Sequence, residues 1–175
     1  MIPKAELIYA HDFVKRLYQG EAEKFDEAWL GFVNQGELFE IVFDKAIETI
    51  LINMPKVTGY DWPLENSFLP VYLVIDGQAF AQPLTLVVTS NPEQMLYDLI
   101  RILTQLNIKS GFINDEKRDQ IFQKVVQEVI ESSNLDLSDA INDADLVLRE
   151  KYGANYQASD LDLTSHPLRY YLKNK

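Results

Sequence analysis

The stretch FLPVYLVIDGQAFAQPLTLVVT, residues 68–89, interrupts a chain whose apolar residues otherwise recur with helical spacing. It is rich in β-branched and aromatic residues and places Asp76-Gly77 between two apolar runs, which is typical of a β-hairpin with a two-residue type I′ turn. In that register Pro70 faces Pro83, and neither proline has an N–H for a ladder. We therefore predict a hairpin around Asp76-Gly77. Because a lone hairpin is marginal in water, it must lie on helices, pair with another strand or pair across a homodimer.

Three helices are predicted before this stretch. Apolar residues recur at helical spacing over about 5–18, 22–34 and 37–53. A residue typical of a helix end follows each segment, in the order Gly20, Gly36 and Pro55. The connections are two or three residues long, so neighbouring helices should be antiparallel. The segment 54–67 has two prolines, a glycine and no periodicity, which predicts a loop.

Helical spacing returns after the predicted hairpin. Ser90 and Glu93 form a capping-box pattern with Pro92 in the first turn, and a broad apolar stripe follows. Further helices are predicted from a cap at Asn114 to about 132, from about 137 to 152 with a stop at Gly153, and briefly after Ser165. The chain is thus predicted to be a single α+β domain, 1–175, that is predominantly helical: three N-terminal helices, a β-hairpin around Asp76-Gly77, and three to four C-terminal helices.

The composition is that of an ordinary globular domain, with 47% hydrophobic and 25% charged residues. There is no cysteine, which excludes disulfides, thiolate nucleophiles and Cys-ligated metals. The 27 acidic and 16 basic residues give a net charge of −11, and such a surface repels nucleic acid and anionic lipid. No apolar run is long enough to span a membrane, and Glu6, His11 and Asp12 interrupt the N-terminal stretch where a signal peptide would be apolar. We expect a cytoplasmic protein.

Common catalytic signatures are absent from the sequence. Gly31 and Gly36 have the spacing of a P-loop, but Glu37 stands where the phosphate-binding Lys belongs. Neither a dinucleotide-binding G-x-G-x-x-G nor a nucleophile-elbow G-x-S-x-G occurs. The two histidines, His11 and His166, lie in no metal or triad motif. We therefore nominate no catalytic residue, metal ligand or cofactor, and the balance of these observations favours a protein that is not an enzyme.

One predicted helix carries an acidic stripe. Glu37, Glu40, Asp44 and Glu48 fall within an arc of about 80° on one face. Such a face can hold a divalent cation in helical bundle enzymes. The opposite face is apolar, so a core side and a solvated side account for the helix completely, and we favour the solvated face over a metal site.

A second acidic cluster lies within ten positions, at Asp136, Asp139, Asp143 and Asp145. A calcium loop would need Gly where Asp139 stands and a bidentate Glu where Asp145 stands. Helical spacing continues through the segment, which a calcium loop would break. We interpret the cluster as an acidic helix start, favoured by the helix dipole and available to a basic protein partner.

The segment GYDWP, residues 59–63, carries two aromatic residues next to a proline. Tyr60 and Trp62 could be displayed as interface anchors, a role in which Tyr and Trp are enriched, or could fold back over the edge of the core. Trp62 between Asp61 and Pro63 is taken here as displayed.

Together these features predict an acidic, soluble protein-interaction module, such as a regulator, inhibitor or immunity-type factor. Its predicted binding residues are Tyr60, Trp62, Asp139 and Asp143, and its predicted partner is another protein with a basic surface rather than nucleic acid or membrane. Two alternatives stay open: a divalent-metal-dependent hydrolase that uses Glu37, Glu40 and Asp44, and a small-molecule-binding module with its pocket between hairpin and helices.

Overall fold

The computed structural model describes residues 2–63, 67–77, 79–108 and 115–172. Of these residues 61% are helical, which confirms a mixed fold dominated by helices. The helices are α1 His11–Leu17, α2 Phe25–Thr58, α3 Pro92–Asn107, α4 Asp115–Ser132, α5 Ser138–Tyr152 and α6 Leu168–Leu172, with a 3₁₀ turn at Ala22–Lys24. The strands are β1 Lys4–Ile8, β2 Phe68–Val74, β3 Phe80–Ala81 and β4 Leu84–Val87.

The four strands form one sheet in the order β1-β2-β4-β3, and this overturns the predicted hairpin. β2 is parallel to both β1 and β4, and only the short β3 is antiparallel to β4. Pro70 lies opposite Glu6 rather than Pro83. The apolar runs of β2 and β4 are nearly continuous, which is typical of parallel strands, although burial alternates along much of β2, where Leu69, Val71 and Leu73 are buried and Pro70 and Tyr72 only half-buried. Since β2 is paired on both edges, a homodimer through the predicted hairpin loses its basis.

The residues of the predicted turn have another role. Gly77 has a φ of 108°, but Asp76 does not take the positive φ that a type I′ turn needs. Instead, a carboxylate oxygen of Asp76 accepts a hydrogen bond from the backbone N–H of Gln19 at 3.1 Å. Asp76 therefore ties the end of β2 to the segment after α1.

The first predicted helix is a strand in its N-terminal half. Residues Lys4–Ile8 pair with β2, and helix α1 begins only at His11. Pairing with β2 overrides a local spacing that fits a helix. The spacing alone could not reveal this, because the pairing partner lies more than sixty positions away in the sequence.

Helix α2, which follows α1 and the 3₁₀ turn, makes up most of the connection from β1 to β2 and is one continuous helix of 34 residues, about 50 Å long. It runs through Gly36, where the sequence predicts a break between two antiparallel helices. Gly36 is buried against Tyr9, and a Cβ at this position would lie 2.6 Å from Cε1 of the Tyr9 ring. Tyr9 in turn makes an edge contact with Phe32. Gly36 therefore permits close packing on α2 and does not end the helix.

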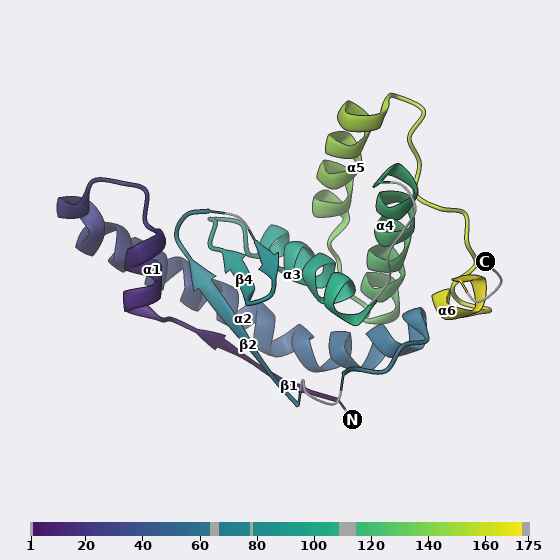
Figure 1. The fold of residues 1–175 in the computed structure, drawn as a ribbon, viewed down its shortest axis with the longest axis horizontal. Coiled ribbons are helices and arrows are strands. Elements are labelled where there is room, and N and C mark those ends of the chain that lie inside the picture. The colour runs from purple at the N-terminus through teal and green to yellow at the C-terminus, as the bar shows by residue number, and fades with distance from the viewer. Residues whose placement is uncertain (1, 64–66, 78, 109–114, 173–175) are drawn as a thin grey trace.

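The core lies between the sheet and two helices. In Figure 1 α2 runs along the sheet and α3 lies beside α2. Helices α4 and α5 stand near the C-terminal end of α2. The fully buried side chains of this core include Phe39, Ile50, Leu51 and Met54 of α2, Leu73 and Leu86 of the sheet, and Met95, Leu96, Leu99 and Ile100 of α3. The long helix thus supplies the surface on which the other layers are built.

The C-terminal helices follow the sequence prediction closely. α3 begins with Pro92, but its cap is Asn91 rather than Ser90, since Oδ1 of Asn91 accepts the N–H groups of Glu93 and Gln94 at 3.1 Å. α5 ends at Gly153, which has a φ of 107°. The predicted cap at Asn114 lies outside the described residues. Among those residues, no helix combines the length and apolar character needed to cross a bilayer.

The two glycines inside α2 provide a test of the Tyr9 contact. Gly31→Ala should raise the free energy of unfolding by roughly 0.5–1 kcal/mol, because alanine is the better helix former and its Cβ meets nothing within 4 Å. Gly36→Ala should lower it, because the Tyr9 ring must leave its packing position. Urea denaturation of both variants measures the difference.

The Tyr9→Ala background is the control for this comparison. There the space beside Gly36 is empty, so Gly36→Ala should stabilise the protein about as much as Gly31→Ala does. Equal stabilisation by both substitutions in the wild-type background would contradict the contact.

Candidate functional site

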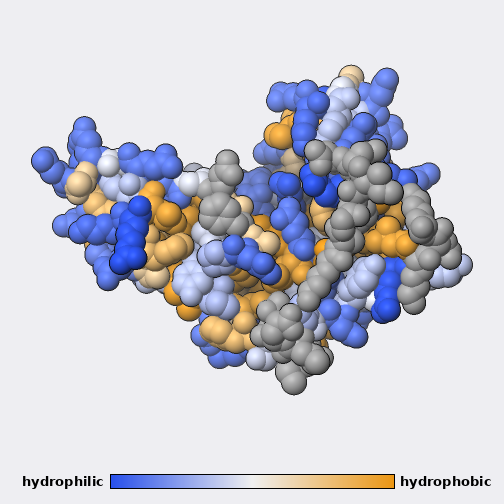
Figure 2. Space-filling model, in the orientation of Figure 1, coloured by the Kyte–Doolittle hydropathy of each residue, from blue (hydrophilic) through white to orange (hydrophobic). Residues whose placement is uncertain are grey.

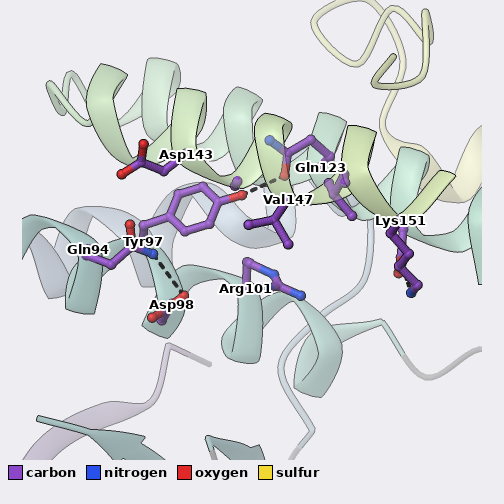
Figure 3. Close-up of a pocket in the computed structure, with 11 residues that line it drawn as sticks. Gln94, Tyr97, Asp98, Arg101, Gln123, Asp143, Val147 and Lys151 are labelled. Carbon is purple, nitrogen blue, oxygen red and sulfur yellow. Dashed lines mark hydrogen bonds and ion pairs between the residues drawn. The ribbon is translucent and has the colours of Figure 1, made fainter. Parts of the chain in front are cut away.

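A cavity of about 420 Å³ lies between α3, α4 and α5 (Figure 3). Its lining combines charged, amide, aromatic and aliphatic side chains, which are Gln94, Tyr97, Asp98, Arg101, Asp119, Gln123, Asp143, Ala144, Val147, Leu148 and Lys151. On α3 the lining residues recur at intervals of three and four, and on α5 they do the same, so each helix offers one face to the cavity. We call this the α3–α5 cavity.

A polar bridge connects the three helices at the cavity wall. The hydroxyl of Tyr97 on α3 donates to Oε1 of Gln123 on α4 at 2.6 Å. Nε2 of Gln123 then donates to Asp145 on α5 at 2.9 Å. Burial raises the pKa of Tyr97 to about 12, with the nearby Arg101 charge opposing that rise. Tyr97 is therefore a neutral donor at physiological pH, which holds the Gln123 amide in one orientation.

Asp98 is a half-buried carboxylate with a neutral partner. Burial raises its pKa, while the charge of Arg101 and a hydrogen bond from Gln94 at 3.2 Å act in the opposite direction. No described cation forms an ion pair with it. A carboxylate whose charged form is penalised by burial inside a cavity is typical of binding and catalytic sites.

Two cations line the other part of the cavity and differ in their partners. Lys151 donates to Asp119 at 3.0 Å, and the hydroxyl of Tyr152 donates to the same carboxylate at 2.7 Å. Burial alone would raise the pKa of Asp119, but the hydrogen bonds from Tyr152 and Lys151 outweigh it and hold that pKa below the usual range. Arg101 makes no hydrogen bond or ion pair with the residues that the structure describes. In Figure 3 its guanidinium extends from α3 toward Val147 and Lys151.

A buried hydroxyl without a partner lies close to this polar group. Tyr156 is only 3% exposed, and its hydroxyl makes no hydrogen bond with the described residues. Its ring stacks on Tyr152, with the ring centroids 5.5 Å apart. Burial raises the pKa of Tyr156, with smaller contributions from Asp119 and Asp145. The hydroxyl is therefore neutral.

The structure places the predicted anchor Trp62 in the core, with 4% of its surface exposed. Pro55 lies in the last turn of α2 and has no N–H, so the Leu51 carbonyl four residues earlier lacks its helical donor. Nε1 of Trp62 donates to that carbonyl at 2.8 Å. Trp62 therefore replaces the missing amide. The structure confirms the alternative that Trp62 folds back onto the core, and a displayed Trp62 that anchors a partner is wrong. The predicted loop also starts too early, since α2 continues through Pro55 to Thr58.

Tyr60 is half-buried on the other side of this segment. Arg169 of α6 lies over its ring at 5.7 Å from the centroid, and its carbonyl accepts from Asn107 at 3.1 Å. The ring is thus partly covered by α6, while a role of Tyr60 in partner binding stays a prediction.

Asp139 and Asp143 are exposed on α5, as their helical spacing predicts. They share one face with Leu146, Val147 and Glu150, within an arc of about 100°. We call these five residues the α5 face. The structure also shows helix rather than a calcium loop across this segment, and Asp145 turns inward to Gln123.

The acidic stripe on α2 is solvent-exposed along its whole length at Glu37, Glu40, Asp44 and Glu48. No group of three or more His, Asp or Glu side chains among the described residues is arranged to hold a metal ion. His11 packs edge-on against Phe25 and Trp29, and His166 stacks on Tyr170. These contacts give both imidazoles a packing role.

The sequence prediction missed the cavity residues of α3. Asp98 and Arg101 lie outside the broad apolar stripe of Met95–Leu106, on the polar face that an amphipathic helix normally has, so their positions in the sequence did not single them out. The contribution of α5 required knowledge of how α3 and α5 pack. No family model, curated protein or solved structure matches this chain.

The role of Trp62 is testable with a double-mutant cycle. Trp62→Phe should lower the free energy of unfolding by about 1–3 kcal/mol, because the Leu51 carbonyl loses its donor. Pro55→Ala restores a backbone N–H to that carbonyl, so Trp62→Phe should cost less in the Pro55→Ala background. Urea denaturation of the four proteins gives the coupling, and strictly additive costs would exclude this role.

The raised pKa of Tyr97 predicts a loss of stability in alkali. The unfolded chain releases this proton near the ordinary pKa of 10.0 and the folded protein only near 12, so stability is retained below about pH 10 and falls between about 10 and 12. The free energy of unfolding of Tyr97→Phe should fall less steeply with pH over that range than that of the wild type. Urea denaturation at a series of pH values measures both. Tyr170→Phe, at an exposed position, is the control and should keep the wild-type slope. Equal slopes for Tyr97→Phe and wild type would contradict the shift.

Proposed function

We propose that this protein is an acidic interaction module that binds a protein partner with a basic surface through the α5 face. One observation carries the proposal: Leu146 and Val147 are 57% and 63% exposed and stand among three exposed carboxylates. Aliphatic side chains inside an acidic surface suit a partner segment that presents both apolar and cationic groups.

The packing of α5 supports this choice of surface. Only Ala140 of its fifteen residues is fully buried, whereas α2 buries thirteen. In Figure 1 α5 stands away from the sheet, and in Figure 2 the end of the molecule that holds it is mostly hydrophilic. Covering an exposed Leu and Val yields up to about 1.5–3 kcal/mol per fully buried side chain.

The charge distribution supports the same partner chemistry. Asp139, Asp143 and Glu150 lie on the α5 face, while Lys151 is engaged by Asp119 beside the cavity. With a net charge of −11, the whole molecule adds to the field that attracts a cationic surface. A regulator, inhibitor or immunity-type factor needs only such a surface and no catalytic group.

A second exposed surface offers a matched comparison. Leu38 and Ile41 of α2 are 51% and 56% exposed beside the acidic stripe. That helix already buries a full core face, so its exposed side chains are the remaining side of a well-packed helix. The α5 face, by contrast, belongs to a helix with little buried surface of its own.

Affinity capture with paired variants tests the surface. A partner captured by the wild-type protein should be lost with Leu146→Ala combined with Val147→Ala, and retained with Leu38→Ala combined with Ile41→Ala. Both pairs truncate exposed aliphatics, so they differ only in location. A partner that is retained by the first pair and lost with the second would move the interface to α2 and contradict the proposal.

The carboxylates should act mainly on association. Asp139→Asn combined with Asp143→Asn should slow binding of the captured partner and flatten its salt dependence, because the steering field weakens. Surface plasmon resonance at several salt concentrations separates the association and dissociation rates. An unchanged association rate with an unchanged salt slope would remove the electrostatic part of the proposal.

A further inference from the structure

We propose that the α3–α5 cavity binds a small dipolar molecule that carries a primary ammonium group and a carboxylate, joined by an apolar spacer. This ligand chemistry goes beyond the proposed protein partner. The cavity shares Asp143 and Val147 with the α5 face, but Asp98 and Arg101 of α3 belong to the cavity alone. Substitutions at these two α3 residues therefore test the cavity without changing the α5 face, so the two proposals can fail separately.

The cavity is polarised in the same direction along both helices. Asp98 precedes Arg101 on α3, and Asp143 precedes Lys151 on α5. Figure 3 shows Asp98, Asp143 and Gln94 at one end and Arg101 and Lys151 toward the other. Opposite charges at the two ends favour a ligand with charges of the complementary order.

No described cation forms an ion pair at the acidic end. Asp98 accepts a hydrogen bond from the neutral amide of Gln94 and is only partly compensated by the charge of Arg101, one turn further along α3, while Asp143 forms no ion pair with the described residues. A ligand ammonium between these carboxylates would add an ion pair that the described residues do not supply, and its N–H groups suit carboxylate acceptors.

The basic end has one cation to offer. Lys151 is already bound to Asp119, whereas the guanidinium of Arg101 has no partner among the described residues. Arg101 presents N–H groups in the planar arrangement that binds a carboxylate with two parallel hydrogen bonds. We therefore assign the ligand carboxylate to Arg101.

The wall between the two ends is apolar. It consists of the Tyr97 ring, Ala144, Val147 and Leu148. The helical rise places the backbone of Arg101 only about 4.5 Å beyond that of Asp98, and in Figure 3 the Arg101 side chain extends further toward the Lys151 end. A short aliphatic chain between the two charged groups of the ligand would lie along the apolar wall.

Three probes of one length test the assignment: ε-aminocaproate, n-hexylamine and caproate. In NMR titrations of the full chain, ε-aminocaproate should shift the amide signals of α3 and α5 and bind about tenfold more tightly than either single-charge probe. Equal binding of n-hexylamine and ε-aminocaproate would overturn the dipolar assignment, and so would the absence of any shift.

Substitutions at each end identify the groups. Arg101→Gln should remove the preference for ε-aminocaproate over n-hexylamine, and Asp98→Asn should weaken both. Arg149→Gln and Asp26→Asn are matched controls, since both residues are exposed, on α5 and α2, and neither lines the cavity or belongs to the α5 face. Thermal melts establish that each variant folds. Unchanged affinities in folded Arg101→Gln and Asp98→Asn would contradict the site.

The same two charges also occur together at the end of a peptide whose last residue is lysine. A hexapeptide ending in lysine is therefore compared with its C-terminal amide and with ε-aminocaproate. Tighter binding of the free-acid peptide would identify a chain end as the ligand, and tighter binding of ε-aminocaproate a free small molecule; both results support the dipolar chemistry. Equal binding of peptide acid and peptide amide, with no binding of ε-aminocaproate, would overturn it.

Discussion

Parallel pairing of β1 with β2 is the constraint on which this fold depends. Two neighbouring parallel strands need a connection that returns along the sheet, and α2 provides that return in one uninterrupted helix. The same helix then anchors the C-terminal half. Asn53 donates to the Ser132 carbonyl at the end of α4 at 2.9 Å, and Thr58 donates to Asn107 at the end of α3 at 2.6 Å. The helices that enclose the α3–α5 cavity are thus positioned from α2.

The C-terminal helices were predictable because their boundaries are encoded locally. Asn91, Pro92 and Gly153 act on their own turn of chain, so sequence spacing is enough to place the ends of α3 and α5. The N-terminal half depends on contacts between distant residues. Gly36 has the appearance of a helix stop, and only the Tyr9 ring, 27 positions earlier, shows why a glycine stands there. The parallel strands were misread because Asp-Gly is a strong local turn signal, while the continuous apolar character of β2 and β4 is more typical of parallel strands.

The candidate sites divide in the same way. The exposure of Asp139 and Asp143 follows from helical spacing within α5, and it was predictable. A displayed Trp62 was expected because its partner could not be seen in the sequence. That partner is the Leu51 carbonyl, which Pro55 leaves without a helical donor, and this follows only once α2 is known to continue through Pro55. The α3–α5 cavity needed the packing of three helices. Asp98 and Arg101 occupy the polar face of an amphipathic helix, which sequence reasoning assigns to solvent by default.

The continuity of α2 can be measured directly by electron–electron double resonance between two spin labels. The chain has no cysteine, so Glu27→Cys and Lys45→Cys introduce the only labelling sites, and both positions are exposed on α2. Eighteen residues make five helical turns, which places both labels on one face with Cα atoms about 27 Å apart. The account predicts one narrow distribution near that separation. A helix break at Gly36 with antiparallel packing would bring the two positions to within about 10 Å and would contradict it.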